Sequence, residues 1–347
     1  MTSAVRINDD KLIGQWLTLC AVTIFGMILL GGVTRLTESG LSMVDWRPIM
    51  GVVPPLSTND WVHLFDQYKL YPEYQLVNQG MSLAEFKQIF WFEYLHRMLG
   101  RLIGLMFFIP LMVFLWMGKV QSSLKPHLVI LLFLGGFQGL MGWYMVQSGL
   151  VDRPDVSQYR LTAHLGLAIA IYAYIVWLTI GLFSPERQPR NDAESSVFNM
   201  IGLVYLMILS GGFVAGTNAG LSFPTWPLMG DRFIPPALYR DGLVSAFEQV
   251  TTIHFNHRML AYITGAVLIF AALRALLKST DRRLRLASIV MLLAVCFQII
   301  LGISTVLSHV DLTIAAGHQG GAVVLLTTVL FWVHCHRTSS ASASEES

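Results

Sequence analysis

Charged residues are scarce in this sequence. Asp, Glu, Lys and Arg make up 13% of its 347 residues, whereas hydrophobic residues make up 54%. A soluble protein of this length does not carry so much apolar surface, because it has too few polar residues to cover it. The composition therefore excludes a soluble globular protein and indicates that the chain lies in a lipid bilayer. The formal net charge is only +2, and we expect no nucleic-acid partner.

Cysteine is also scarce. The three cysteines, Cys20, Cys296 and Cys335, lie in or at the end of apolar stretches and show no metal-binding spacing. We interpret them as small residues of the helix packing. With so few cysteines we expect no disulfide framework on the outer side of the membrane.

Long apolar runs take up most of the chain. About 20 apolar residues are enough to span a bilayer as a helix. The first run is too long for a signal peptide, follows Asp9 and Asp10, and precedes no A-x-A site, so we expect it to be a retained helix. We therefore predict an all-α integral membrane protein with eight transmembrane helices. The runs lie at about residues 13–33, 92–117, 126–147, 161–183, 197–216, 256–277, 284–307 and 314–334.

Basic and acidic residues favour opposite ends of these runs. The positive-inside rule places the basic connections in the cytoplasm. Both termini are then expected in the cytoplasm of a bacterial cell, at its inner membrane, or in the matrix if the chain is mitochondrial. The Ser-rich residues 338–347 are expected to be disordered. The basic residues are Arg6, Lys11, Lys119, Lys125, Arg187, Arg190, Lys278, Arg282, Arg283 and Arg285.

The two halves of the chain repeat the same motifs in the same order. GGVTRLTESGLSMVDW (31–46) matches GGFVAGTNAGLSFPTW (211–226). FQGLMGWYMVQS (137–148) matches FQIILGISTVLS (297–308). The order of motifs is kept although the loops between them differ in length, which indicates an internal duplication.

Each half contains four of the eight runs. We assign residues 1–185 to the first half and residues 195–337 to the second. A unit of four spans ends on the side where it begins, so the halves should be related by an axis near the membrane normal. We expect two pseudo-symmetric four-helix bundles, with sites between facing helices.

Each half carries one histidine in an HRML motif and a second one further on. These are His96 and His164 in the first half, and His257 and His318 in the second. All four begin even-numbered spans, so two lie at similar depth near the outer face in each half. Ligating groups inside a membrane span are costly and indicate function. Two imidazoles at one depth suit a planar macrocycle between them, or a metal with two nitrogen ligands.

Carboxylates and thiolates are rare near these histidines. They are the usual companions of zinc and non-haem iron. Haem needs only axial ligands and an apolar slot, which aromatic and Met side chains can supply. The sequence therefore favours haem over a bare metal.

The halves differ three residues before each HRML histidine, where the first has Glu93 and the second has His254. This spacing places Glu93 on the same helix face as His96. A carboxylate beside only one pair suggests that one site does chemistry and the other transfers electrons. The alternative is a carboxylate at a helix N-terminus, where the helix dipole stabilises it.

Arg97 and Arg258 directly follow the HRML histidines. A guanidinium binds a carboxylate through two parallel hydrogen bonds, so these arginines are candidates to pair with haem propionates. The alternative is that they extend to the membrane interface.

The connections after the first and fifth runs are rich in Trp, Pro and Gly. They contain WRPIMGVVPP and TWPLMGDRFIPP, and the first continues to about residue 90 with a short helix expected near 82–90. Such segments at a membrane surface can cap a site. For Trp46 and Trp226 the alternative is simple anchoring at the interface.

Several of these motifs together resemble haem A synthases. They are GGVTRLTESGLSMVDWRP, EYLHRMLGR, TAHLGLA, GTNAGLSFPTWPLM, FNHRMLAY and GHQGGA, and they cover about Gly31 to His318. The lack of paired cysteines in the outer loops resembles the alphaproteobacterial and mitochondrial branch. The resemblance implies a membrane oxidoreductase that oxidises the C8 methyl group of haem O to a formyl group, by successive hydroxylations and loss of water.

The resemblance also assigns roles to residues. It implies that His96 and His164 serve the substrate haem O, and that His257 and His318 ligate a haem b cofactor. Glu93 matches the family's acidic residue, whereas His254 stands where a Gln is expected.

The partners implied are the enzyme that makes haem O, an electron donor and cytochrome oxidase assembly factors, and a homo-oligomer is compatible with the sequence. Two other functions stay open: a di-haem b electron carrier of the quinone oxidoreductase type, and a transporter.

Overall fold

The computed structural model describes residues 3–44, 50–150, 154–184 and 197–339. Within these ranges eight helices are long and apolar enough to cross a membrane, which confirms the expected all-α integral membrane class. They are α1 (Ser3–Leu36), α4 (Leu83–Trp116), α5 (Lys125–Gln147), α6 (Gln158–Leu182), α7 (Phe198–Gly216), α9 (Val250–Lys278), α10 (Arg282–Leu307) and α11 (Leu312–Ser339). Shorter helices are η1 (Met50–Val52), α2 (Thr58–Tyr68), α3 (Pro72–Leu76), η3 (Ala219–Leu221), η4 (Gly242–Val244) and α8 (Ser245–Glu248).

Helix α4 is longer than the sequence suggested. It begins at Leu83 rather than near residue 92, because Ser82 and Glu85 form a capping box. The Ser82 hydroxyl accepts from the Glu85 backbone N–H, and the Glu85 carboxylate accepts from that of Ser82. The helix expected near 82–90 is therefore present, and it forms the first turns of α4.

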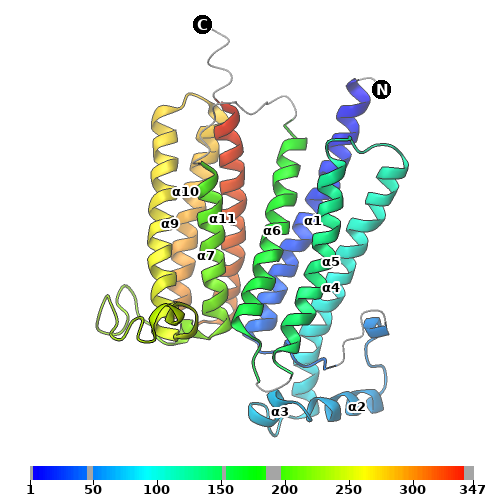
Figure 1. Ribbon diagram of the computed structural model, residues 1–347, viewed down its shortest axis with the longest axis vertical. Coiled ribbons are helices and arrows are strands. Elements are labelled where there is room, and N and C mark those ends of the chain that lie inside the picture. Colours follow the sequence, from blue (N-terminus) through cyan, green and yellow to red (C-terminus); the bar gives the residue numbers. More distant parts are fainter. Residues whose placement is uncertain (1–2, 45–49, 151–153, 185–196, 340–347) are drawn as a thin grey trace.

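The two ends of the helix array differ in character (Figure 1). Helix α1 begins and α11 ends at one end, while α2, α3 and the connection between α7 and α9 lie at the other. This agrees with an even number of spans. Helix α11 includes Thr338 and Ser339. The predicted boundary of the disordered segment, at residue 338, was therefore at least two residues too early. Residues 340–347, as well as Trp46, Arg187 and Arg190, lie outside the described residues.

The helices of each half contact one another in a closed circuit. In the first half α1 contacts α4 and α6, and α5 contacts the same two helices. In the second half α7 contacts α9 and α11, and α10 contacts the same two helices. The halves meet where α1 and α6 contact α11, and where α6 contacts α7.

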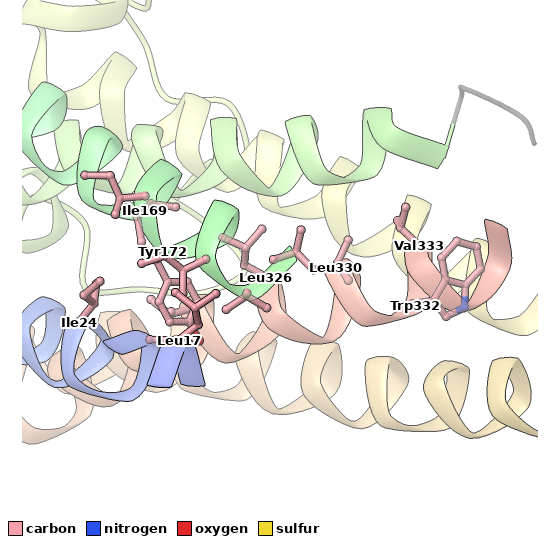
Figure 2. Packing of buried hydrophobic residues seen from close by; sticks show 14 of the residues in the cluster. Leu17, Ile24, Ile169, Tyr172, Leu326, Leu330, Trp332 and Val333 are labelled. Atoms are coloured by element: carbon pink, nitrogen blue, oxygen red, sulfur yellow. The ribbon is translucent and has the colours of Figure 1, made fainter. Parts of the chain in front are cut away.

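The main apolar core lies where the halves meet. Leu17 of α1, Tyr172 of α6 and Leu326 of α11 are among its buried side chains (Figure 2). Tyr172 also hydrogen-bonds through its hydroxyl to Thr327 of α11 at 2.8 Å. The core is thus built from helices of both halves. No disulfide joins the cysteines among the described residues. Cys20 and Cys335 are buried as expected, but Cys296 is exposed, so its interpretation as a residue of the helix packing was wrong.

Glycines let the halves approach closely at repeat-related positions. A Cβ on Gly166 of α6 would lie 2.7 Å from Leu209 of α7. A Cβ on Gly320 of α11 would lie 2.8 Å from Leu29 of α1. Each glycine therefore receives the repeat-equivalent leucine from the opposite half.

An aromatic cluster covers the end of α4 in the first half. Trp61, Phe65 and Tyr68 of α2 pack against Phe86 and Phe90 of α4. This cluster, which we call the aromatic cap, packs α2 against the first turns of α4. Glu93 and His96 follow these turns along the same helix.

Candidate functional site

Each of the four repeat histidines lies against a glycine of the preceding long helix. A Cβ placed on three of these glycines would come within 3.0 Å of the imidazole Cε1, and on the fourth within 3.4 Å. At 3.0 Å the imidazole would have to move by a few tenths of an ångström, so glycine leaves these three rings room at their present positions, whereas 3.4 Å is close to ordinary contact. The pairs are Gly31 with His96, Gly142 with His164, Gly211 with His257 (the 3.4 Å pair), and Gly302 with His318.

The four histidines come together in two pairs, one in each half. His96 and His164 are near enough to interact electrostatically, and so are His257 and His318. All four are half-buried. Among the described residues no group of three or more His, Cys, Asp or Glu side chains comes together as a metal site, so the donors brought together here are imidazole pairs.

A glutamine holds the second histidine of each half. Gln138 Nε2 donates to the His164 carbonyl at 3.1 Å and lies 3.2 Å from its Nδ1. Gln298 Nε2 donates to the His318 carbonyl at 3.0 Å and lies 3.1 Å from its Nδ1. The sequence shows these glutamines only as shared residues of the repeat, and their identity in both halves was the signal for a role.

The HRML histidines are held differently in the two halves. Ser210 Oγ lies 2.8 Å from Nδ1 of His257. Nδ1 of His96 is buried and has no hydrogen-bond partner among the described residues. Leu30 occupies the position in the first half that corresponds to Ser210.

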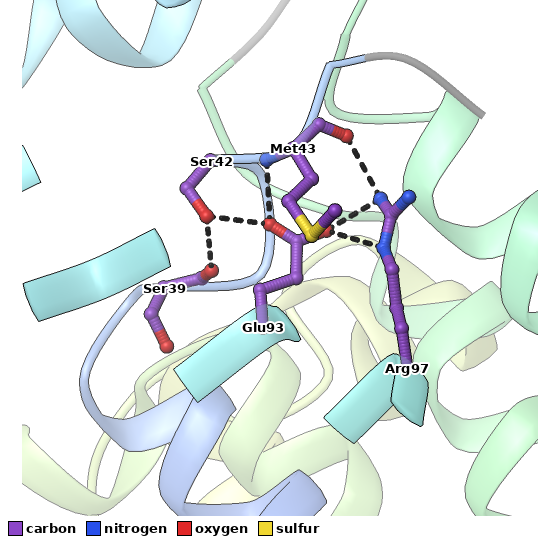
Figure 3. A network of polar contacts seen from close by, with 5 residues as sticks. All are labelled: Ser39, Ser42, Met43, Glu93 and Arg97. Carbon is purple, nitrogen blue, oxygen red and sulfur yellow. Dashed lines mark hydrogen bonds and ion pairs between the residues drawn. The ribbon is translucent and has the colours of Figure 1, made fainter. Parts of the chain in front are cut away.

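Glu93 lies at the centre of a buried polar network (Figure 3). Its Oε2 accepts from Ser42 Oγ at 2.7 Å and from the Met43 N–H at 2.8 Å. Its Oε1 accepts from Arg97 Nη2 at 2.6 Å and from Arg97 Nε at 3.1 Å. The carboxylate thus ties the segment after α1 to α4, one turn before His96.

The second half builds the corresponding contact without a carboxylate. Arg258 Nε donates to His254 Nε2 at 3.1 Å. Arg258 Nη2 donates to the Phe223 carbonyl at 2.8 Å, as Arg97 Nη2 does to the Met43 carbonyl at the same distance. Since Met43 and Phe223 are equivalent in the repeat, both arginines fasten the same loop position.

These contacts decide two of the alternatives. Glu93 is the eleventh residue of α4 and only 3% exposed, so it is not a carboxylate at a helix N-terminus. Arg97 and Arg258 do not extend to an interface, because their side chains are largely enclosed and bind loop carbonyls. Pairing of either arginine with a propionate stays a prediction.

The residues present fit a haem in each half. In each half two imidazoles from different helices come near each other, and glycines make room for the rings. Ser210 contacts the ring of His257, and Gln138 and Gln298 bind the backbone carbonyls of His164 and His318. This set supplies the two axial nitrogen ligands that a haem requires.

Known proteins resemble this chain over nearly its whole length. The model of the COX15-CtaA family, described as cytochrome oxidase assembly protein, matches residues 14–330. Heme A synthase of Nitrosospira multiformis is 49% identical over 332 residues, covering 94% of this chain and 93% of that protein. Heme A synthase of Nitrosomonas eutropha is 46% identical over 335 residues, with 94% of each chain covered. The heme A synthase of Paramagnetospirillum magneticum is 45% identical over 332 residues, with 93% of each covered. The chain therefore belongs to the COX15-CtaA family of cytochrome oxidase assembly proteins.

Proposed function

We propose that this protein is a haem A synthase of the bacterial inner membrane, which oxidises the C8 methyl group of haem O to a formyl group and so provides haem A for cytochrome oxidase. The named relatives, nearly half identical over almost the whole chain, carry this proposal. The paired histidines support it independently, because a protein that acts on haem needs a place to hold one.

The two halves would divide the work. His96 and His164 of the first half (1–185) would hold the substrate haem O, next to Glu93. His257 and His318 of the second half (195–337) would hold a resident haem b. When bound, haem b supplies electron-transfer chemistry. The difference between Glu93 and His254 supports this assignment, since only the first half places a carboxylate one turn from its HRML histidine.

Glu93 would serve the reaction by its position and its charge. Arg97 and the two loop donors surround both oxygens of the carboxylate. From that network the carboxylate can orient the loop over the first-half site and hold or release a proton beside His96. Arg97 and Arg258 would keep the two loops closed, and we propose that they also meet the propionates of the two haems.

Orientation and partners complete the proposal. The positive-inside rule supports cytoplasmic termini and outer sites. The enzyme that makes haem O would deliver the substrate from within the bilayer, an electron donor would reduce the second-half haem, and cytochrome oxidase assembly factors would receive the product.

Extraction of haems from cells tests the function directly. A strain that makes haem O but lacks its own haem A synthase should produce haem A when it expresses this chain. Accumulation of haem O alone, with two haem b groups in the purified protein, would instead support a di-haem electron carrier.

A further inference from the structure

The contact between Ser210 and His257 sets the protonation of the imidazole. Ser210 has a single hydroxyl proton, which it donates to the Met207 carbonyl at 2.8 Å. Toward His257, 2.8 Å away, the hydroxyl oxygen is therefore an acceptor, and Nδ1 of His257 must be the donor. A proton on Nδ1 leaves the lone pair on Nε2, the nitrogen that would then be free to bind haem iron.

The first half lacks this device. Leu30 has no group that accepts a hydrogen bond, and Nδ1 of His96 is buried without a partner among the described residues. The other histidine of each pair does not share the difference, because Gln138 and Gln298 hold His164 and His318 in the same way. The asymmetry is thus confined to the two HRML histidines.

Such a contact changes how well a histidine holds a metal. An acceptor at Nδ1 fixes the ring orientation and the tautomer and makes the imidazole a stronger base. Loss of such an outer partner typically lowers metal affinity about 10–100-fold. A ring without one rotates more freely and releases its ligand more readily.

We infer that Ser210 is a positioning residue that makes His257 a permanent haem ligand, and that Leu30 at the equivalent place makes His96 an exchangeable one. The inference rests on the proposed function, and it deepens that function by explaining how one half keeps its haem while the other releases its product. The difference comes from one side chain on α1 and its counterpart on α7.

The test uses the full chain in detergent, loaded with two equivalents of ferric haem b and then challenged with excess apomyoglobin as haem acceptor. Release should show a fast and a slow phase. The fast phase should disappear in His96→Ala and the slow phase in His257→Ala. Absence of any haem that depends on His257 would contradict the proposed function itself, separately from the inference.

Two isosteric variants isolate the hydroxyl. Ser210→Thr keeps it and Ser210→Val removes it, so any general disturbance by the extra bulk is common to both. We expect Ser210→Val to release the slow-phase haem about 10–100-fold faster than Ser210→Thr, with a higher midpoint potential, because a weaker base stabilises the ferric iron less. Equal release rates and equal potentials in two folded variants would overturn the role of Ser210.

The reciprocal variant tests the first half. Leu30→Ser places a hydroxyl before His96, one turn after Met27, which corresponds to Met207. The fast phase should become slower and approach the slow one, and more haem should stay with the purified protein. An unchanged fast phase would overturn the exchangeable-ligand half of the inference.

Discussion

Glu93 and Arg97 form an ion pair enclosed within the protein, with 2.6 Å between Oε1 and Nη2 and side-chain exposures of 4% and 11%. The repeat-related pair in the second half joins Arg258 to an imidazole nitrogen of His254, which accepts the bond and so carries no proton. The two repeat-related arginines therefore have different partners: Arg97 faces a charged carboxylate, and Arg258 faces a neutral imidazole.

Removing each arginine should reveal this difference. Arg97→Ala leaves a buried carboxylate without its cation, which costs about 3–5 kcal/mol. Arg258→Ala leaves a neutral imidazole unsatisfied, which costs about 1–3 kcal/mol. We expect Arg97→Ala to lower the midpoint of thermal unfolding in detergent more than Arg258→Ala does. Equal losses would mean that the bonds to the loop carbonyls dominate at both positions.

Glu93→Gln should separate the chemistry from the fold. The amide keeps the shape, but it turns one acceptor into a donor that faces the donors of Ser42, Met43 or Arg97. We expect a stability loss of about 1–3 kcal/mol, with haem b retained and haem A lowered about 100-fold or more. Chromatography of extracted haems should show haem O or a hydroxylated intermediate in its place.

His254→Gln is the matched control for that variant. It changes the equivalent position in the second half to another neutral side chain that can accept from Arg258. Haem A production should continue in this variant. Normal haem A production in Glu93→Gln would show that Glu93 only holds the loop.

Much of the fold and of the site followed from sequence pattern. Apolar length gave the eight spans, and the duplication brought out the histidine pairs and the pair of Glu93 and His254. The start of α4 was missed, because a capping box at Ser82 lies in a polar stretch outside the apolar run. The contact of Ser210 with His257 was missed because a lone serine in an apolar helix gives no signal until the position of the neighbouring imidazole is known.

The glycines beside the histidines should resist substitution. In Gly302→Ala the new Cβ would lie 3.0 Å from Cε1 of His318, so the ring must shift away from the position in which it would hold haem b. We expect a weakened low-spin haem b spectrum and a lower haem content. Gly139→Ala is the control, because nothing lies within 4 Å of a Cβ there and alanine favours a helix by about 1 kcal/mol over glycine.

Reporter fusions test the orientation in the membrane. Helices α2 and α3 and the connection between α7 and α9 lie at the end of the array opposite to the start of α1 and the end of α11 (Figure 1). Alkaline phosphatase fused after residue 60 or residue 235 should therefore be active outside the cytoplasm, while a fusion after residue 120 or 280 should be inactive. The reverse pattern of activity would show that the histidine sites face the cytoplasm.

The aromatic cap should lose stability as the pH rises. Glu73 lies there outside the membrane spans, 5% exposed, and accepts a hydrogen bond from Tyr68 at 2.8 Å. Burial raises the pKa of Glu73 from 4.5 to about 8, against the lowering effect of the Tyr68 hydroxyl. The folded state therefore holds a proton that the unfolded state has lost. That stabilisation is complete below pH 4.5 and disappears as the pH rises through about 8.

Glu73→Gln should remove this pH dependence, because an amide stays neutral and still accepts from Tyr68. Thermal unfolding of the variant and the unchanged protein at about pH 5 and pH 8 would show it: the variant should be the more stable of the two at the higher pH. Asp60→Asn is the control. Hydrogen bonds from Ser57 lower the pKa of Asp60 below 3.8, so its titration lies under the tested range and the slope between pH 5 and 8 should persist. If the stability of Glu73→Gln still fell between pH 5 and pH 8, the pH dependence would belong to other groups.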